Sequence, residues 1–130
     1  MDATRVLVIE DDADIRRLLR ELLEDEGRFR VATAKNGLEA LKALGEIEKP
    51  HVILLDLQMP ELDAAGFRAI QESDQAIADI PVIVMSADWA VEWKSLKLGL
   101  NKFIRKPIDF EKLLGLIDEV HLAKPIYGDV

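Results

Sequence analysis

The sequence contains no cysteine among its 130 residues. This absence excludes a disulfide framework and thiolate chemistry, and it agrees with a reducing compartment such as the cytoplasm. The first twelve residues, MDATRVLVIEDD, are interrupted by charge, so they are neither a signal peptide nor a membrane span. Basic residues are also in deficit, with 17 against 25 acidic ones and a net charge of −8. This argues against direct nucleic-acid binding, which needs a basic surface, but it is compatible with a protein partner that carries a basic patch.

Apolar stretches alternate along the chain with amphipathic ones. The central stretch, HVILLDLQMP at 51–60, contains four consecutive apolar residues, which is typical of a strand buried on both faces. Pro60 is expected to end its pairing. The alternation predicts an α/β fold, a parallel sheet with helices on both faces, and a single domain over residues 1–130. The predicted strands are 5–10, 29–34, 52–56, 80–85 and 102–105, and the predicted helices are about 12–26, 36–49, 64–73, 89–98 and 109–122.

Helical periodicity predicts which apolar side chains face the core. Trp89, Trp93 and Leu96 share one side of the fourth helix, and we interpret them as packing residues rather than partner contacts. The other positions expected to face inward in the first three helices are Ile15, Leu18, Leu19, Leu22, Leu23, Leu38, Leu41, Leu44, Ile47, Phe67 and Ile70.

Polar residues follow four of the predicted strands, at the point where each strand ends. In a parallel sheet these strand ends meet at one edge, where open α/β sheets bind their ligands. Three carboxylates brought together there repel one another unless a cation joins them. Oxygen ligands without histidine or cysteine suit Mg²⁺, and a metal, a lysine and a hydroxyl around one carboxylate suit a phosphoryl group. The residues are Glu10, Asp11, Asp56, Ser86 and Lys106.

Each of these residues also has an ordinary structural explanation. Acids that precede a helix are favoured by capping and by the helix dipole, and for Asp12 we expect capping alone. Asp56 could begin a turn, the Ser86 hydroxyl could simply form a hydrogen bond at the end of a strand, and Lys106 could be an ordinary solvent-exposed lysine. Their convergence on one sheet edge favours the functional interpretation.

Four landmarks in order make the chain resemble the receiver domain of two-component response regulators, over about residues 5–122. They are VIEDD at 8–12, LLDLQMP at 54–60, VMSA at 84–87 and IRKPID at 104–109. Each is weak alone, but the ordered set at successive strand ends is specific. The resemblance implies a flavodoxin-like three-layer sandwich with strand order 2-1-3-4-5.

The resemblance also implies a role for each matching residue. Asp56 would accept a phosphoryl group from the phosphohistidine of a sensor kinase or phosphotransfer protein. Mg²⁺ would be bound by Glu10, Asp11, Asp56 and the backbone carbonyl of Gln58. Lys106 would pair with the phosphoryl oxygens, and the Lys106–Pro107 peptide would be cis. Ser86 would donate a hydrogen bond to the attached phosphoryl group, and Phe103 would occupy the position of the switch aromatic residue.

Two departures from the family pattern fall away from the phosphorylation site. Ala64 stands where glycine is usual, so the loop before it is expected to differ in shape, and Phe103 lacks the hydroxyl of the commoner tyrosine.

The expected protein is therefore a cytoplasmic phosphoacceptor rather than an enzyme, acting on a downstream protein target. Homodimerisation on phosphorylation stays open, as does a receiver that is part of a longer protein. The alternative function is a Mg²⁺-dependent phosphatase on a flavodoxin-like fold. It is ranked lower, because the haloacid-dehalogenase type places its nucleophile after the first strand and an aspartate where Gln58 stands.

Overall fold

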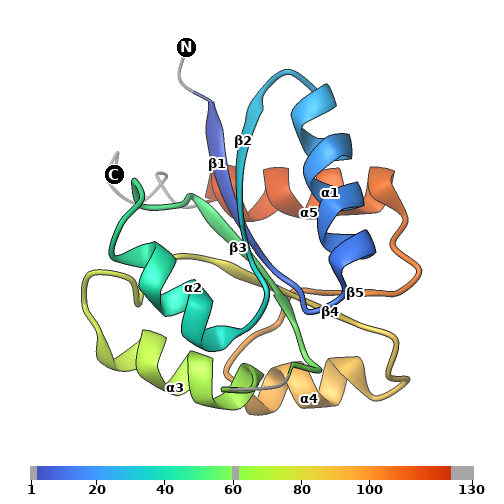
Figure 1. Cartoon of the computed structure of the whole chain (residues 1–130). Helices are drawn as coiled ribbons and strands as arrows, with labels where there is room; N and C mark the ends of the chain where they lie inside the picture. The colour runs from blue at the N-terminus through green and yellow to red at the C-terminus, as the bar shows by residue number, and fades with distance from the viewer. Residues whose placement is uncertain (1–2, 60–61, 124–130) are drawn as a thin grey trace.

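Strands and helices alternate along the whole described chain, as the sequence predicted (Figure 1). The computed structural model describes residues 3–59 and 62–123. The strands are β1 (Thr4–Ile9), β2 (Phe29–Ala34), β3 (Val52–Asp56), β4 (Val82–Ser86) and β5 (Phe103–Arg105). The helices are α1 (Ala13–Asp25), α2 (Gly37–Leu44), α3 (Ala64–Ser73), α4 (Val91–Lys97) and α5 (Phe110–Ala123).

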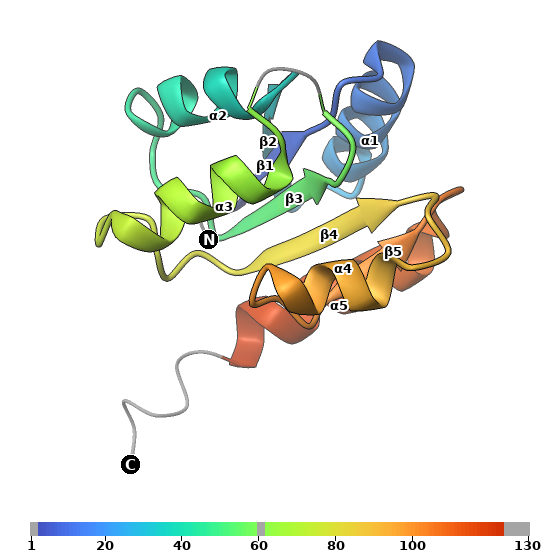
Figure 2. The ribbon, with the colours of Figure 1, turned by 90° about the horizontal axis from the view of Figure 1, so that it is seen from below.

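The strands form one five-stranded parallel sheet in the order β2-β1-β3-β4-β5. Helices α2, α3 and α4 cover one face, and α1 and α5 cover the other (Figures 1 and 2). Alternate residues of each central strand therefore enter opposite cores. In β1, Leu7 and Ile9 contact the α2–α3–α4 side, while Val6 and Val8 contact the α1–α5 side. This burial on both faces explains why the strand sequences are continuously apolar rather than alternating.

Side chains at the helix N-termini fix where the first three helices begin. Asp12 caps α1 by accepting hydrogen bonds from the backbone N–H groups of Asp14 and Ile15, at 2.9 and 3.1 Å. Asn36 caps α2 and Asp63 caps α3 in the same way. The interpretation of Asp12 as a capping residue is confirmed, and capping by a short polar side chain is the usual way to satisfy the first free N–H groups of a helix.

The loop between β3 and α3 has an unusual backbone at Leu62, whose φ is 58°. Its carbonyl oxygen lies so close to Gly37 that a Cβ atom there would be 2.5 Å away. The absence of a side chain at position 37 thus allows the loop to approach α2. Pro60, which was expected to end the pairing of β3, lies outside the described residues, as does the tail beyond residue 123.

Several apolar residues that were expected to face the core are exposed, and those predictions were wrong. The exposed fractions are 61% for Trp93 and 57% for Leu96, both on α4, and 88% for Trp89, which precedes the helix. The physical reason is that α4 begins at Val91 and buries Val91 and Ser95, which are four residues apart. Trp93 and Leu96 therefore fall on the opposite side of the helix. The other exposed residues are Leu18, Leu38, Ile47 and Ile70.

Candidate functional site

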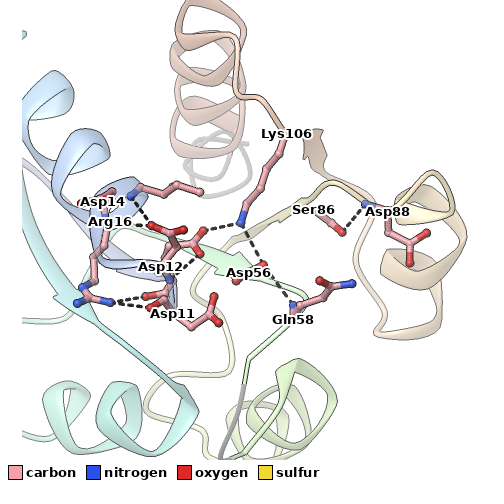
Figure 3. Close-up of polar contacts among 11 residues, drawn as sticks. Asp11, Asp12, Asp14, Arg16, Asp56, Gln58, Ser86, Asp88 and Lys106 are labelled. Carbon is pink, nitrogen blue, oxygen red and sulfur yellow. Dashed lines mark hydrogen bonds and ion pairs between the residues drawn. The ribbon is translucent and has the colours of Figure 1, made fainter.

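The carboxyl ends of β1, β3, β4 and β5 lie at one edge of the sheet (Figure 3). The strand pairing places Ile9 beside Leu55, Asp56 beside Met85 and Ser86 beside Arg105. In the register of the sheet, the last residue of each of these strands thus lies level with the neighbouring strand's end to within one or two residues. The polar residues that follow the strands are brought together because of this register.

Lys106 connects two of the carboxylates. Its Nζ atom lies 2.8 Å from Glu10 Oε1 and 3.4 Å from Asp56 Oδ1. Glu10 is fully buried and Asp56 is 2% exposed, so both would be costly to ionise without a cation. Burial alone would lower the pKa of Lys106, but its hydrogen bonds and charge interactions with Glu10 and Asp56 outweigh burial and raise that pKa.

Glu10, Asp11 and Asp56 form a cluster in which one carboxylate oxygen from each lies within 4.8 Å of the others. The pKa of Asp56 is raised to about 7, first by burial, then by its hydrogen bond with Asp11 and the negative charge of Glu10. The Gln58 N–H, which donates to Asp56 Oδ1 at 3.2 Å, and Lys106 oppose this rise. An oxygen-only donor set with excess negative charge fits a hard divalent cation.

Ser86 lies at the end of β4, and its hydroxyl faces the backbone N–H of Asp88 (Figure 3). It is 1% exposed, and its Oγ accepts a hydrogen bond from the Asp88 N–H at 3.0 Å. A hydroxyl that accepts one hydrogen bond still has its proton to donate. The contact with Asp88 therefore leaves the Ser86 hydroxyl proton unused.

Comparison with known proteins identifies the family. The family model of the response regulator receiver domain matches residues 6–118. The chain belongs to this family. The predicted resemblance is therefore confirmed, and so is the predicted fold, because the sheet order and the solved structures of receiver domains agree with it.

Individual relatives support the same conclusion. The chain is 38% identical over 124 residues to the uncharacterized 14.6 kDa protein in the sodA1 3'region of Leptolyngbya boryana, covering 92% of each chain. The receiver domain of a signal transduction histidine kinase from Syntrophus aciditrophicus superposes with a TM-score of 0.83 at 26% identity, covering 95% of this chain and 93% of that one. The receiver domain of the sensor histidine kinase PA1611 from Pseudomonas aeruginosa, solved with a magnesium ion coordinated in its active site cleft, has a TM-score of 0.83 at 20% identity. That comparison covers 93% of this chain and 99% of that one. Other curated relatives, mostly transcriptional regulators, are longer, and this receiver domain spans 23% to 50% of their length.

Two residues at the site were missed from the sequence. Asp88 fixes the loop after β4, since its side chain accepts from the Ala90 N–H and pairs with Lys94. These contacts, first the Lys94 hydrogen bond, lower the pKa of Asp88. The pattern Ser86-Ala-Asp88 resembles a cap and could have indicated this. Arg16 donates from Nη1 to the backbone carbonyl of Glu10 at 2.8 Å. No sequence pattern indicates this contact, because it joins a helix side chain to a loop carbonyl six residues earlier.

Phe103, the expected switch residue, is half-buried and packs against the core on the α4 side of the sheet. The Arg105 guanidinium lies 5.8 Å from its ring centroid and donates from Nη1 to the carbonyl of Trp89 at 3.2 Å. Arg105 therefore lies between the ring and the segment that precedes α4. The Lys106–Pro107 peptide is cis, as the resemblance implied. Within the described residues, no helix is both long and apolar enough to cross a bilayer.

Proposed function

We propose that Asp56 accepts a phosphoryl group from the phosphohistidine of a sensor histidine kinase or phosphotransfer protein. The observation that carries this proposal is the environment of the Asp56 carboxylate. It lies at the end of β3, clustered with Glu10 and Asp11 within 4.8 Å and 3.4 Å from the Lys106 ammonium. Phosphoryl transfer requires a nucleophile beside positive charge, which Lys106 supplies directly and the acidic cluster supplies once it binds a divalent cation.

In the transfer, an Asp56 oxygen attacks phosphorus, a P–O bond forms and the P–N bond to the donor histidine breaks. Lys106 needs only a small movement from Asp56 Oδ1 to contact the phosphoryl oxygens, because its stem already places Nζ at 3.4 Å. Glu10, Asp11, Asp56 and the backbone carbonyl of Gln58 would hold Mg²⁺. Bound there, the ion neutralises charge that develops on the transferred group. The magnesium ion in the Pseudomonas receiver domain supports this choice of metal.

Ser86 and Phe103 would convert the phosphorylation into a change of surface. Ser86 would turn its hydroxyl proton to the phosphoryl group, and Phe103 would turn further inward beside it. The Arg105 guanidinium lies 5.8 Å from the Phe103 ring centroid and donates to the Trp89 carbonyl, so it would pass a movement of the ring to the segment before α4. Trp93 and Leu96 on α4, with Trp89 just before the helix, are exposed and apolar, and we expect a downstream protein to bind there.

An apolar groove next to the site supports the proposal that the phosphoryl donor is a protein. It runs between α1 and the start of α5, and its lining includes Leu18, Leu22, Lys106, Pro107 and Phe110. Leu18 is 54% exposed in it. A donor that binds this groove would present its phosphohistidine beside Asp56.

We further propose that residues 1–130 act as one receiver domain with its core at about 5–122, located in the cytoplasm and without direct nucleic-acid contact. It would not turn over a substrate, apart from gaining and losing its own phosphoryl group. Phosphorylation would alter either binding to a partner protein or homodimerisation. The number of subunits in the phosphorylated species distinguishes the two.

Incubation with acetyl phosphate and Mg²⁺ tests the assignment of Asp56. The protein should gain one alkali-labile phosphoryl group, detected by intact mass, and Asp56→Asn should gain none. Asp12→Asn is the matched control, because asparagine caps a helix as well as aspartate does, and the Asp12 side chain caps α1 and is not one of the proposed ligands. Full labelling of Asp56→Asn would refute the assignment. Many turnovers of acetyl phosphate without an adduct would favour the phosphatase alternative.

A further inference from the structure

Arg16 donates hydrogen bonds to the loop that carries two of the clustered carboxylates. It lies in the first turn of α1, and its Nη1 donates to the Glu10 carbonyl at 2.8 Å and, more weakly, to the Asp11 carbonyl at 3.4 Å. These are the backbone carbonyls of the two residues after β1, beyond its last paired residue, Ile9. The Glu10 N–H still donates to the Ala34 carbonyl of β2 at 3.0 Å, so the sheet holds the N–H side of Glu10. The guanidinium holds the carbonyl of Glu10 and, more weakly, that of Asp11.

We propose that Arg16 is a positioning residue for Mg²⁺ binding. This rests on the proposed function, in which Glu10 and Asp11 are ligands. Arg16 contacts their backbone rather than their carboxylates, and in Figure 3 it approaches the loop from the side opposite to Lys106. It thus takes no ligand oxygen away from a metal, whereas Lys106 binds the carboxylates themselves.

The need for such a residue follows from the charges in the loop. Glu10, Asp11 and Asp12 are consecutive acids, and the first two lie in a cluster with Asp56. Without a cation the carboxylates repel one another, and rotation of the peptide between Glu10 and Asp11 would turn the exposed Asp11 side chain away. A hydrogen bond to the Glu10 carbonyl opposes that rotation. The backbone N–H of Arg16 also donates to the Asp12 carbonyl at 2.9 Å, so the first turn of α1 and the loop are held together.

Two effects of removing Arg16 have opposite signs. Loss of a nearby positive charge would attract Mg²⁺ more strongly, while loss of the hydrogen bonds would leave the ligands disordered before binding. The guanidinium is partly exposed, so water screens its charge, whereas a short charge-assisted hydrogen bond acts directly on the peptide. We therefore expect the positioning effect to dominate and the affinity to fall.

The test compares Arg16→Gln with Arg17→Gln. Both changes remove one positive charge from α1, but Arg17 is exposed and pairs with Asp14 on the helix surface. Isothermal titration of the unphosphorylated protein with MgCl₂ should give about five- to tenfold weaker binding for Arg16→Gln. Arg17→Gln should stay within about twofold of the original protein. Equal affinities in the two variants, or tighter binding in Arg16→Gln, would overturn the proposal.

A second measurement separates positioning from a role in the chemistry. Labelling by acetyl phosphate is followed against Mg²⁺ concentration. Arg16→Gln should need more Mg²⁺ for half its maximal rate and should reach the same rate at saturation. A low rate at saturating Mg²⁺ would contradict a positioning role. If Arg16→Gln does not fold, judged by circular dichroism, Arg16→Lys replaces it. Lysine keeps the charge and one donor, so about two- to threefold weaker binding is expected and tighter binding would again overturn the proposal.

Failure of this proposal can be told apart from failure of the proposed function. If the original protein binds Mg²⁺ but gains no adduct at Asp56, the function fails while the comparison of the two arginines still holds. If the adduct forms normally and both variants bind Mg²⁺ alike, only the role of Arg16 fails.

Discussion

The Lys106 ammonium lies 3.4 Å from the Asp56 carboxylate before any phosphoryl group is attached. It lies closer still to Glu10, at 2.8 Å. The same cation thus balances two buried acids in the unmodified protein and is in reach of a group bonded to Asp56. The receiver domain is therefore arranged for an added dianion in advance, which lowers the reorganisation that phosphorylation requires.

Removing that cation should destabilise the fold in the absence of metal. We expect Lys106→Ala to lower the free energy of unfolding by about 2 to 4 kcal/mol, because Glu10 and Asp56 would be left buried and unpaired. Mg²⁺ should still bind and restore part of this loss, although phosphorylation should no longer alter partner binding. Urea denaturation with and without Mg²⁺ measures the effect. Lys102→Ala is the control, since Lys102 pairs with Glu119 at the surface and its loss should cost about 1 kcal/mol or less. Similar losses in both variants, or normal partner binding by phosphorylated Lys106→Ala, would contradict this account.

The raised pKa of Asp56, about 7, predicts how stability depends on pH. The folded state keeps the Asp56 proton up to about pH 7, while the unfolded state loses it near its ordinary value of 3.8. The unfolded state binds fewer protons between these values, so this group makes the metal-free protein less stable as pH rises from about 4 to 7. Asp56→Asn should remove the effect, with a gain over the original protein that grows across this window to roughly 4 kcal/mol at most. Denaturation of both proteins at pH 5 and pH 8 without Mg²⁺ provides the measurement. A gain that is the same at the two values would mean that Asp56 ionises normally.

Two glycines should respond to alanine in opposite directions. At Gly37 a Cβ would lie 2.5 Å from the Leu62 carbonyl, and the resulting strain should destabilise the fold by about 1 to 2 kcal/mol. At Gly115, on the exposed side of α5, a Cβ would meet nothing within 4 Å, and alanine should stabilise by about 0.5 to 1 kcal/mol. Midpoints of urea denaturation distinguish the signs. A stabilising Gly37→Ala would show that the loop at Leu62 does not approach α2 in solution.

Ser86→Ala should separate phosphorylation from its structural consequence. The variant keeps Asp56 and its neighbours, so labelling by acetyl phosphate should persist. Its response should be lost, because no hydroxyl remains to donate to the phosphoryl group. Trp93 lies on α4 and Trp89 just before it, so both report a change around this helix. The response is measured as the change in tryptophan emission when the phosphate mimic beryllofluoride is added. Ser86→Thr keeps the hydroxyl and should restore the change in emission. An unaltered response in Ser86→Ala would remove this residue from the switch.

The exposed tryptophan on α4 should matter for binding and not for folding. Trp93 is 61% exposed, so Trp93→Ala should cost about 1 kcal/mol or less in stability. Phe67→Ala, in the fully buried core, should cost about 3 to 5 kcal/mol. Capture of a downstream protein in the presence of beryllofluoride should be lost with Trp93→Ala. If capture is normal, the partner binds elsewhere on the domain.

The sequence by itself determined the order of strands and helices and the residues at the strand ends. The predicted ranges 29–34 and 64–73 coincide with β2 and α3, because apolar periodicity and capping are local properties of the chain. It also placed Glu10, Asp56 and Lys106 at one edge, since parallel strands end on the same side.

Only the tertiary structure decided which apolar side chains are covered and how the site is held together. Trp93 and Leu96 are as apolar as core residues, and their exposure depends on which side of α4 meets the sheet. The contact between Glu10 and Lys106 joins residues that are far apart in the sequence, and the approach of Leu62 to Gly37 joins a loop to the start of α2. Such contacts are set by the register and packing of elements far apart in sequence, which no local pattern of residues contains.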